Sequence, residues 1–127
     1  MSDTSHTIRL ASDAAGESHF EEVEVELSML DFAPPAPPLL ISASEPTSSY
    51  ALVRLPAGWL GEAHPSPHRQ ILFCLKGALE VTASDGGRRR LAAGDVWLME
   101  DTAGKGHRTE VVAGPFEGAI VRLADRA

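Results

Sequence analysis

Three histidines and a glutamine are the side chains of this sequence that could together bind a metal ion or a polar ligand. His64, His68 and Gln70 lie in the stretch HPSPHRQ, and His107 ends the later stretch EDTAGKGH. A neutral imidazole nitrogen is a good ligand for zinc, iron, manganese or nickel, whereas a glutamine amide oxygen is a weaker one. Because apolar, strand-like runs lie on both sides of these stretches, we expect the residues to line the pocket of a small β-barrel.

His68 is a candidate only under one conformation of its segment. In an extended strand, residues 64, 66, 68 and 70 share one side, and His68 would add a third imidazole to the site. Pro65 and Pro67 make a bulge the competing arrangement, which would leave His68 at the surface beside Arg69. Both arrangements are compatible with the sequence.

Two further side chains could act on a ligand in the same pocket. Trp59 follows Gly58, and its indole could either pack at the barrel rim or stack on a ligand ring. Glu100 ends an apolar run near the expected pocket. A carboxylate desolvated there would have a raised pKa and could act as a catalytic general base, whereas at the surface it would have no such role.

Length and composition indicate one globular domain and exclude several functions. The 127 residues are 43% hydrophobic and 23% charged, which is typical of a folded domain. The net charge of −7 argues against nucleic acid as a partner, because phosphate binding needs clustered lysine and arginine. No apolar run approaches the roughly 20 residues that cross a membrane, and the N-terminus lacks the pattern of a signal peptide. We therefore expect a cytoplasmic protein.

The N-terminal third contains strands followed by a proline-rich segment. Val23, Val25 and Leu27 alternate with glutamates, which predicts a strand with one buried face within the N-terminal strands at about residues 7–30. Residues 31–38 contain four prolines, which cannot donate to a β-ladder. We expect an extended connection here that serves as a strap across the barrel or as a dimer contact.

The rest of the chain alternates between short apolar runs and turn signals. Asp85, Gly86 and Gly87 form the strongest hairpin signal. No stretch has an apolar stripe at helical spacing, so we predict an all-β sandwich or barrel. The expected strands are residues 39–41, 50–55, 70–75, 78–82, 89–91, 96–99, 107–112 and 117–123.

The spacing around His64 resembles the first sequence motif of the cupin superfamily. The matching positions are Gly58, His64, Ser66, Gln70 and Gly77. In metal-binding cupins this motif carries two histidines and a glutamate as ligands. Here His64 matches the first histidine, whereas Ser66 replaces the second histidine and Gln70 replaces the glutamate.

The second cupin motif is similar to the segment from Gly94 and Asp95 to His107, although the loop EDTAGKGH is longer than usual. More narrowly, the chain looks like a small bacterial single-domain cupin. The resemblance implies a cupin-type jelly-roll β-barrel, with residues 1–127 as a single domain, a barrel core at about residues 50–124, and a homodimer.

The resemblance leaves two functions open and does not decide whether the protein is an enzyme. In the first, His64, Gln70, His107 and conditionally His68 hold a divalent transition metal, which could assist oxygenation, isomerisation or cyclisation of a small oxygenated compound. In the second, the pocket binds a small organic ligand without metal, as a sensor or carrier does. Fold alone does not choose between them.

Overall fold

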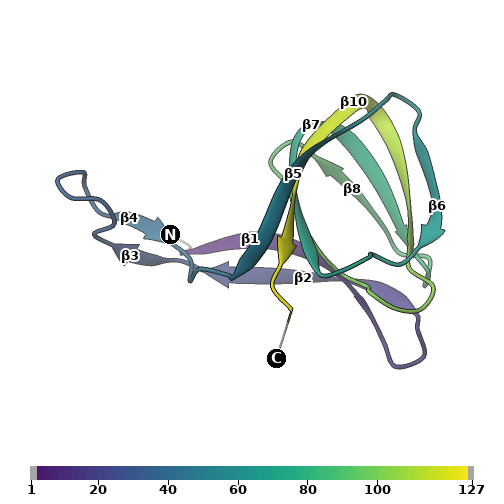
Figure 1. The fold of residues 1–127 in the computed structure, drawn as a ribbon, viewed down its shortest axis with the longest axis horizontal. Coiled ribbons are helices and arrows are strands. Elements are labelled where there is room, and N and C mark those ends of the chain that lie inside the picture. The colour runs from purple at the N-terminus through teal and green to yellow at the C-terminus, as the bar shows by residue number, and fades with distance from the viewer. Residues whose placement is uncertain (1–2, 126–127) are drawn as a thin grey trace.

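The computed structural model describes residues 3–125 (Figure 1). This part of the chain forms β-strands and no helix, which confirms the prediction of an all-β fold. None of it is a helix long and apolar enough to cross a membrane. The strands are β1 (Thr4–Ser12), β2 (Ser18–Glu26), β3 (Ser28–Leu30), β4 (Leu39–Ile41), β5 (Thr47–Leu55), β6 (Leu60–His64), β7 (Gln70–Ala83), β8 (Arg88–Ala92), β9 (Val96–Glu100) and β10 (His107–Leu123).

The main sheet curves round on itself as a jelly roll. Its strand order is β2-β1-β9-β7-β10-β5, with β6 paired to β10 and β8 paired to β7. All these pairs are antiparallel except β1 with β9. Figure 1 shows β5, β6, β7, β8 and β10 arranged around a common interior, with β1 and β2 along one end.

Two long strands, β7 and β10, hold the barrel together. Each was expected as two separate strands, with breaks at Gly77 and at Gly114–Pro115. Both instead continue through those positions, because the β7–β10 ladder absorbs the irregularities as register shifts between residues 111 and 118. The short strand β6, which ends at His64, was not predicted. It pairs with the start of β10 and so forms one wall of the interior.

The hydrophobic core lies inside this barrel and follows the alternation of the strands. Along β7, Leu72 and Cys74 are buried, whereas Phe73 and Leu75 face outward. Burial, and to a smaller extent Asp95, raises the pKa of the Cys74 thiol to about 12, as expected for a cysteine that acts as a small hydrophobe. The buried cluster comprises Leu10, Leu72, Cys74, Leu79, Val81, Ala83, Leu91, Trp97, Met99, Val111 and Phe116.

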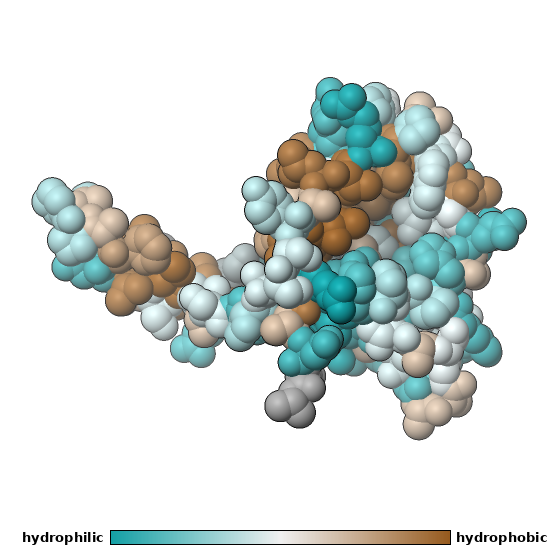
Figure 2. Space-filling view, viewed as in Figure 1, coloured by the Kyte–Doolittle hydropathy of each residue, from teal (hydrophilic) through white to brown (hydrophobic). Residues whose placement is uncertain are grey.

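The proline-rich segment does not cross the barrel, so the prediction of a strap is wrong. Residues 31–38 form the loop of the β3–β4 hairpin, which projects from the barrel as an arm (Figure 1). Within the loop, the Ala36 amide donates to the Ala33 carbonyl at 2.9 Å. The prolines cannot donate to a ladder, and the two short apolar strands beside them pair with each other instead. Figure 2 shows that apolar side chains cover much of this arm.

Candidate functional site

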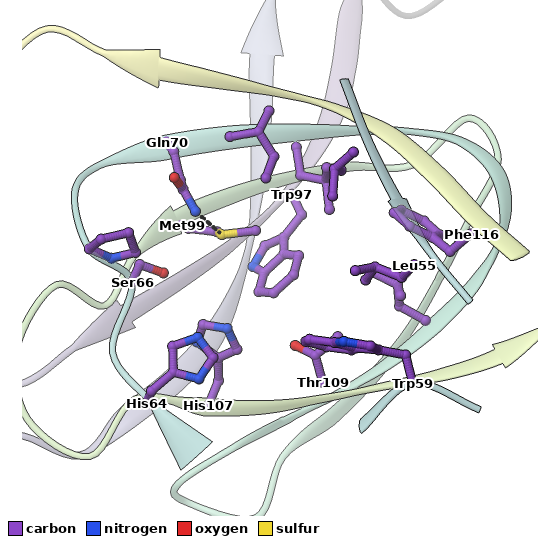
Figure 3. Close-up of a pocket in the computed structure, with 15 residues that line it drawn as sticks. Leu55, Trp59, His64, Ser66, Gln70, Trp97, Met99, His107, Thr109 and Phe116 are labelled. Atoms are coloured by element: carbon purple, nitrogen blue, oxygen red, sulfur yellow. Dashed lines mark hydrogen bonds between the residues drawn. The ribbon is translucent and has the colours of Figure 1, made fainter. Parts of the chain in front are cut away.

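A cavity of about 230 Å³ lies inside the barrel, with β5, β6, β7, β9 and β10 all contributing to its wall (Figure 3). Polar side chains gather at one end of it, and apolar and aromatic side chains form the other end. The residues that line it are Val53, Leu55, Trp59, His64, Ser66, Pro67, Gln70, Leu72, Leu79, Trp97, Met99, His107, Thr109, Phe116 and Ile120.

The pairing of β6 with β10 brings two of the predicted histidines together. His64 ends β6 and His107 begins β10, and the two residues are register partners. Their ring centroids are 5.2 Å apart, with the rings tilted by 47°. His64 is exposed at the edge of the cavity, whereas His107 is buried. The Nδ1 atom of His64 is 2.6 Å from the Glu62 carbonyl oxygen, which fixes the orientation of this ring.

Gly106 allows the loop before His107 to reach His64. Its φ is +70°, in the left-handed region that favours glycine. A Cβ atom at this position would lie 2.1 Å from the carbonyl carbon and oxygen of His64. Only a residue without a side chain therefore permits this approach of the two backbones, which sets the distance between the imidazoles.

A buried carboxylate orients His107. Asp101 is fully buried, and its Oδ2 atom lies 2.6 Å from His107 Nδ1. The Ser66 hydroxyl donates to Asp101 Oδ1 at 2.8 Å, and the Ser66 amide donates to the Asp101 carbonyl oxygen at 2.9 Å. Ser66 occupies the position at which the first cupin motif has its second histidine. In this chain it holds the carboxylate that supports the remaining histidine.

Gln70 and Trp97 complete the polar end. The Gln70 side chain is buried, and its amide nitrogen donates to Met99 Sδ at 3.1 Å (Figure 3). Trp97 packs edge-on against His107, with ring centroids 5.1 Å apart and an interplanar angle of 80°. Among the described residues, Trp97 Nε1 is the buried side-chain polar atom that has no hydrogen-bond partner.

Trp59 lies on the opposite, apolar wall together with Leu55 and Phe116 (Figure 3). Its ring lies over Gly61, where a Cβ atom would be 2.6 Å from the indole. The indole is half-buried and forms part of the cavity surface. Its predicted role in stacking on a ligand therefore has a suitable location and stays a prediction.

His68 does not join the other histidines. The backbone bends at residues 67–69 instead of continuing as a strand, so the alternation that would place His68 beside His64 is broken. His68 is half-buried and is not among the residues that line the cavity. The expectation that it supplies a third imidazole to this pocket is not met.

Glu100 is also outside the cavity, so of the two roles that the sequence left open for it, a general base with a raised pKa is the one that the structure contradicts. Its carboxylate accepts hydrogen bonds from Nε of Arg9 and, at 2.6 Å, from Nε of Arg69. Burial alone would raise the pKa of this carboxyl, but the hydrogen bonds and charges of the two guanidinium groups outweigh burial and lower it. Glu100 is therefore part of an ion-pair cluster on the outer side of β9.

Alternation along β9 could have identified the residues that the sequence analysis missed. Trp97 and Met99 are buried and Leu98 and Glu100 are only partly buried, which is the period of two of a strand. Extending that period by one step places Asp101 on the inner side, as the structure does. Glu100 was predicted because it lies at a strand end. The side of the strand decides which carboxylate faces the site, and the inner side carries Asp101.

The side chains at the polar end fit a metal ion only in part, with two imidazoles as the strong ligands. His64 and His107 are suitable, whereas the Ser66 hydroxyl donates to Asp101. The Gln70 amide nitrogen donates to Met99, which leaves only the weakly binding amide oxygen of Gln70 for a metal. Within residues 3–125, no group of three or more histidine, cysteine, aspartate or glutamate side chains is placed to hold a metal. Catalytic zinc sites usually have three protein ligands.

These features define the class of the molecule: an all-β jelly roll whose interior contains a cavity. A family model, described as the cupin domain, matches residues 51–116, a span that contains every polar residue of the cavity. The chain belongs to the cupin family. A search of curated proteins found no match.

Solved structures support the same fold. The structure of KdgF from Halomonas sp. is 24% identical to this chain, with a TM-score of 0.51, and the alignment covers 78% of this chain and 87% of KdgF. The cupin domain of Cnp3 from Schizosaccharomyces pombe is 15% identical, with a TM-score of 0.51, over 98% of this chain and 86% of that domain. Both comparisons support the jelly-roll fold and carry no functional assignment.

Proposed function

We propose that this protein binds a small amphipathic organic molecule inside the barrel. The observation that carries the proposal is the division of the cavity into a polar end, with His64 and His107, and an apolar wall, with Leu55, Trp59 and Phe116. Ligand pockets typically combine a mostly apolar lining with a few oriented polar groups. The buried hydrogen bond that His107 Nδ1 donates to Asp101 supplies such orientation before any ligand arrives.

A cavity-filling substitution tests this proposal. Val53 lines the cavity, whereas its neighbour Leu52 on the same strand points outward and is 77% exposed. We expect fragments detected by ligand-observed NMR to lose binding in Val53→Phe and to keep it in the matched control Leu52→Phe. Thermal unfolding of both variants verifies that they fold. If no fragment distinguishes the two variants, the cavity is not the binding site.

The second candidate is a weakly held divalent cation at the two imidazoles, with the organic ligand completing its coordination. The observation that favours it is the arrangement of the rings. Each Nδ1 atom already has a hydrogen-bond partner, and no hydrogen bond to Nε2 of either ring is found among the described residues. Nitrogen atoms oriented by such partners are typical metal ligands. A cation there would polarise a ligand oxygen, as metal-assisted oxygenation, isomerisation or cyclisation requires.

Elemental analysis separates the two candidates. Protein exposed to zinc, iron, manganese or nickel and then desalted should retain close to one equivalent of metal if the cation is part of the site. His64→Ala and His107→Ala should then lose it, while His68→Ala, at a histidine outside the cavity, should retain it. A content below about a tenth of an equivalent in the unmodified protein contradicts the cation and leaves the organic ligand.

A further inference from the structure

The hydrogen-bonding direction of each imidazole at the polar end follows from its partner. His64 Nδ1 faces a backbone carbonyl oxygen, and His107 Nδ1 faces the Asp101 carboxylate. A carbonyl oxygen and an ionised carboxylate can only accept hydrogen bonds. Both Nδ1 atoms must therefore carry the hydrogen, and in the neutral rings both Nε2 atoms carry a lone pair. The two histidines thus offer hydrogen-bond acceptors to a ligand.

Trp97 supplies the matching donor. Its indole N–H can donate and cannot accept, and it is buried without a partner among the described residues. In Figure 3 the nitrogen edge of this indole is turned toward Met99 and the histidines and away from Phe116. Buried polar groups in native proteins nearly always have a partner, so an unpartnered N–H on a side chain that lines the cavity points to a ligand atom that reaches it when the cavity is filled. That atom must be an acceptor.

Charge complementarity further restricts the chemical class of the ligand. None of the cavity-lining residues is a lysine, arginine, aspartate or glutamate. An anionic ligand would meet no lysine or arginine side chain, and it would approach the Asp101 carboxylate behind His107. An ammonium group could donate to the histidines but could not accept from Trp97. A hydroxyl group is uncharged and both donates and accepts.

We propose, resting on the proposed function above, that the cavity binds an uncharged molecule with one hydroxyl or two adjacent hydroxyls. A hydroxyl oxygen accepts from Trp97 Nε1, and its one hydrogen is donated to Nε2 of His107 or His64. A second, adjacent hydroxyl donates to Nε2 of the other histidine. The apolar part of the molecule lies against the wall formed by Leu55, Trp59 and Phe116. The ligand class is thus a small alcohol or vicinal diol with an apolar or planar portion.

The ring tautomers provide a test that needs no ligand. Long-range proton–nitrogen NMR of the chelator-treated protein at pH 8, where histidine is ordinarily neutral, distinguishes protonated from unprotonated ring nitrogens. We expect hydrogen on Nδ1 and none on Nε2 for both His64 and His107. Hydrogen on Nε2 of His107 would remove the acceptor and overturn the proposal.

Probes with one phenyl skeleton and different polar heads test the ligand class. We choose 1-phenyl-1,2-ethanediol, the carboxylate phenylacetate, the cation 2-phenylethylammonium, and ethylbenzene. The diol should bind at least about tenfold more tightly than the other three and should shift the indole N–H signal of Trp97. Trp97→Phe, which removes the indole N–H together with one ring, should weaken the diol about tenfold more than it changes the affinity for ethylbenzene, which reports the altered cavity shape.

The other outcomes overturn the inference and are distinguishable from failure of the proposed function. Equal or tighter binding of phenylacetate or the ammonium probe, with loss of binding in Val53→Phe, rejects the hydroxyl ligand while the cavity still binds organic molecules. Failure of the diol to bind, or binding without a response of the Trp97 signal, also rejects it. If the cavity is not a binding site at all, the result is different: fragments then bind Val53→Phe and Leu52→Phe equally.

Discussion

At the scale of single residues, Asp101 is the group on which the polar end of the cavity depends. Its carboxylate accepts hydrogen bonds from both His107 and Ser66, and it has no exposed surface. Asparagine has nearly the same shape, but its NH₂ group would face one of these two donors. We predict that Asp101→Asn lowers the free energy of unfolding by about 2 kcal/mol, measured by urea denaturation.

Asp85 offers a matched control for that substitution. It is exposed, and its carboxylate accepts from the Gly87 amide at 2.8 Å, which an asparagine oxygen can also do. Asp85→Asn should therefore change the free energy of unfolding by less than about 0.5 kcal/mol. Equal effects of the two substitutions would show that the buried pair contributes nothing specific.

Glu100 should make the stability depend on pH. Arg9 and Arg69 outweigh the effect of burial and hold the pKa of its carboxyl below the usual value. A carboxyl whose folded pKa is lowered stabilises the fold above its unfolded pKa of about 4.3, and this stabilisation is lost as the pH falls through the folded value. At pH 7, Glu100→Gln should lower the free energy of unfolding by about 2 kcal/mol.

The difference between the wild type and Glu100→Gln should shrink as the pH falls below about 4.3, because the wild-type carboxyl then becomes protonated as well. Urea denaturation at several pH values measures it. Glu24→Gln, at an exposed position on β2, is the control and should show a small difference at every pH. A gap that stays constant from pH 7 to pH 3 would contradict the lowered pKa.

At the scale of structural elements, the loop between β9 and β10 is predicted to set the geometry of the site through Gly106. Gly86 is a matched position, since its φ is also positive at +92° but nothing lies within 4 Å of an added Cβ atom. We predict a cost of about 1 kcal/mol for Gly86→Ala and about 3 kcal/mol for Gly106→Ala, because only the latter collides with the His64 backbone.

Ligand binding provides a second readout for the glycine pair. Gly106→Ala should move His107 away from His64 and weaken binding of the fragments that the cavity holds, whereas Gly86→Ala should leave their affinity unchanged. Titration by NMR measures both. Similar stability losses with intact binding in both variants would mean that the loop does not position the histidine.

The sequence predicted most of this fold because period-two patterns and turn signals are local. Alternation found the strand at Val23 and Val25, and motif spacing found His64, Gln70 and His107. The curvature that carries β7 and β10 through their expected breaks depends on contacts between distant strands, which local patterns do not contain.

Site details that depend on loop closure were harder to predict. Asp101 reaches His107 only because Gly106 lets the loop fold back, and β6 exists only because β10 pairs with it. His68 and Glu100 were assigned by position along the chain, whereas a bend at residues 67–69 and the alternation of β9 determine where these side chains point.

At the scale of the whole molecule, we predict that the protein is a homodimer held by the β3–β4 arm. An isolated two-stranded hairpin is marginally stable in water, and this one exposes Met29 to 65% and Phe32 to 57%. Figure 2 shows further apolar surface on the barrel beside β5, where Tyr50 and Leu52 are exposed. Apolar patches of this kind usually mark contacts between proteins.

Analytical ultracentrifugation tests the dimer. The protein should sediment with twice its chain mass of 13.5 kDa, and Phe32→Glu should shift it toward the single-chain mass. Leu60→Glu is the control, because Leu60 is also exposed, at 53%, but lies on β6 instead of the arm. Sedimentation of the wild type as a single chain at tens of micromolar would contradict the prediction.

The parallel pairing of β1 with β9 has a consequence for synthesis on the ribosome. Ile8 pairs with Trp97, so the β1–β2 hairpin emerges long before its partner strand has been translated. At ordinary elongation rates the edge of β1 that pairs with β9 stays unpaired for on the order of ten seconds. The glutamates at positions 22, 24 and 26 give the nascent hairpin a charged face during that interval. Such charge acts against pairing with neighbouring nascent chains. Neutralising these glutamates should therefore reduce the yield of folded protein before it affects the stability of the finished molecule.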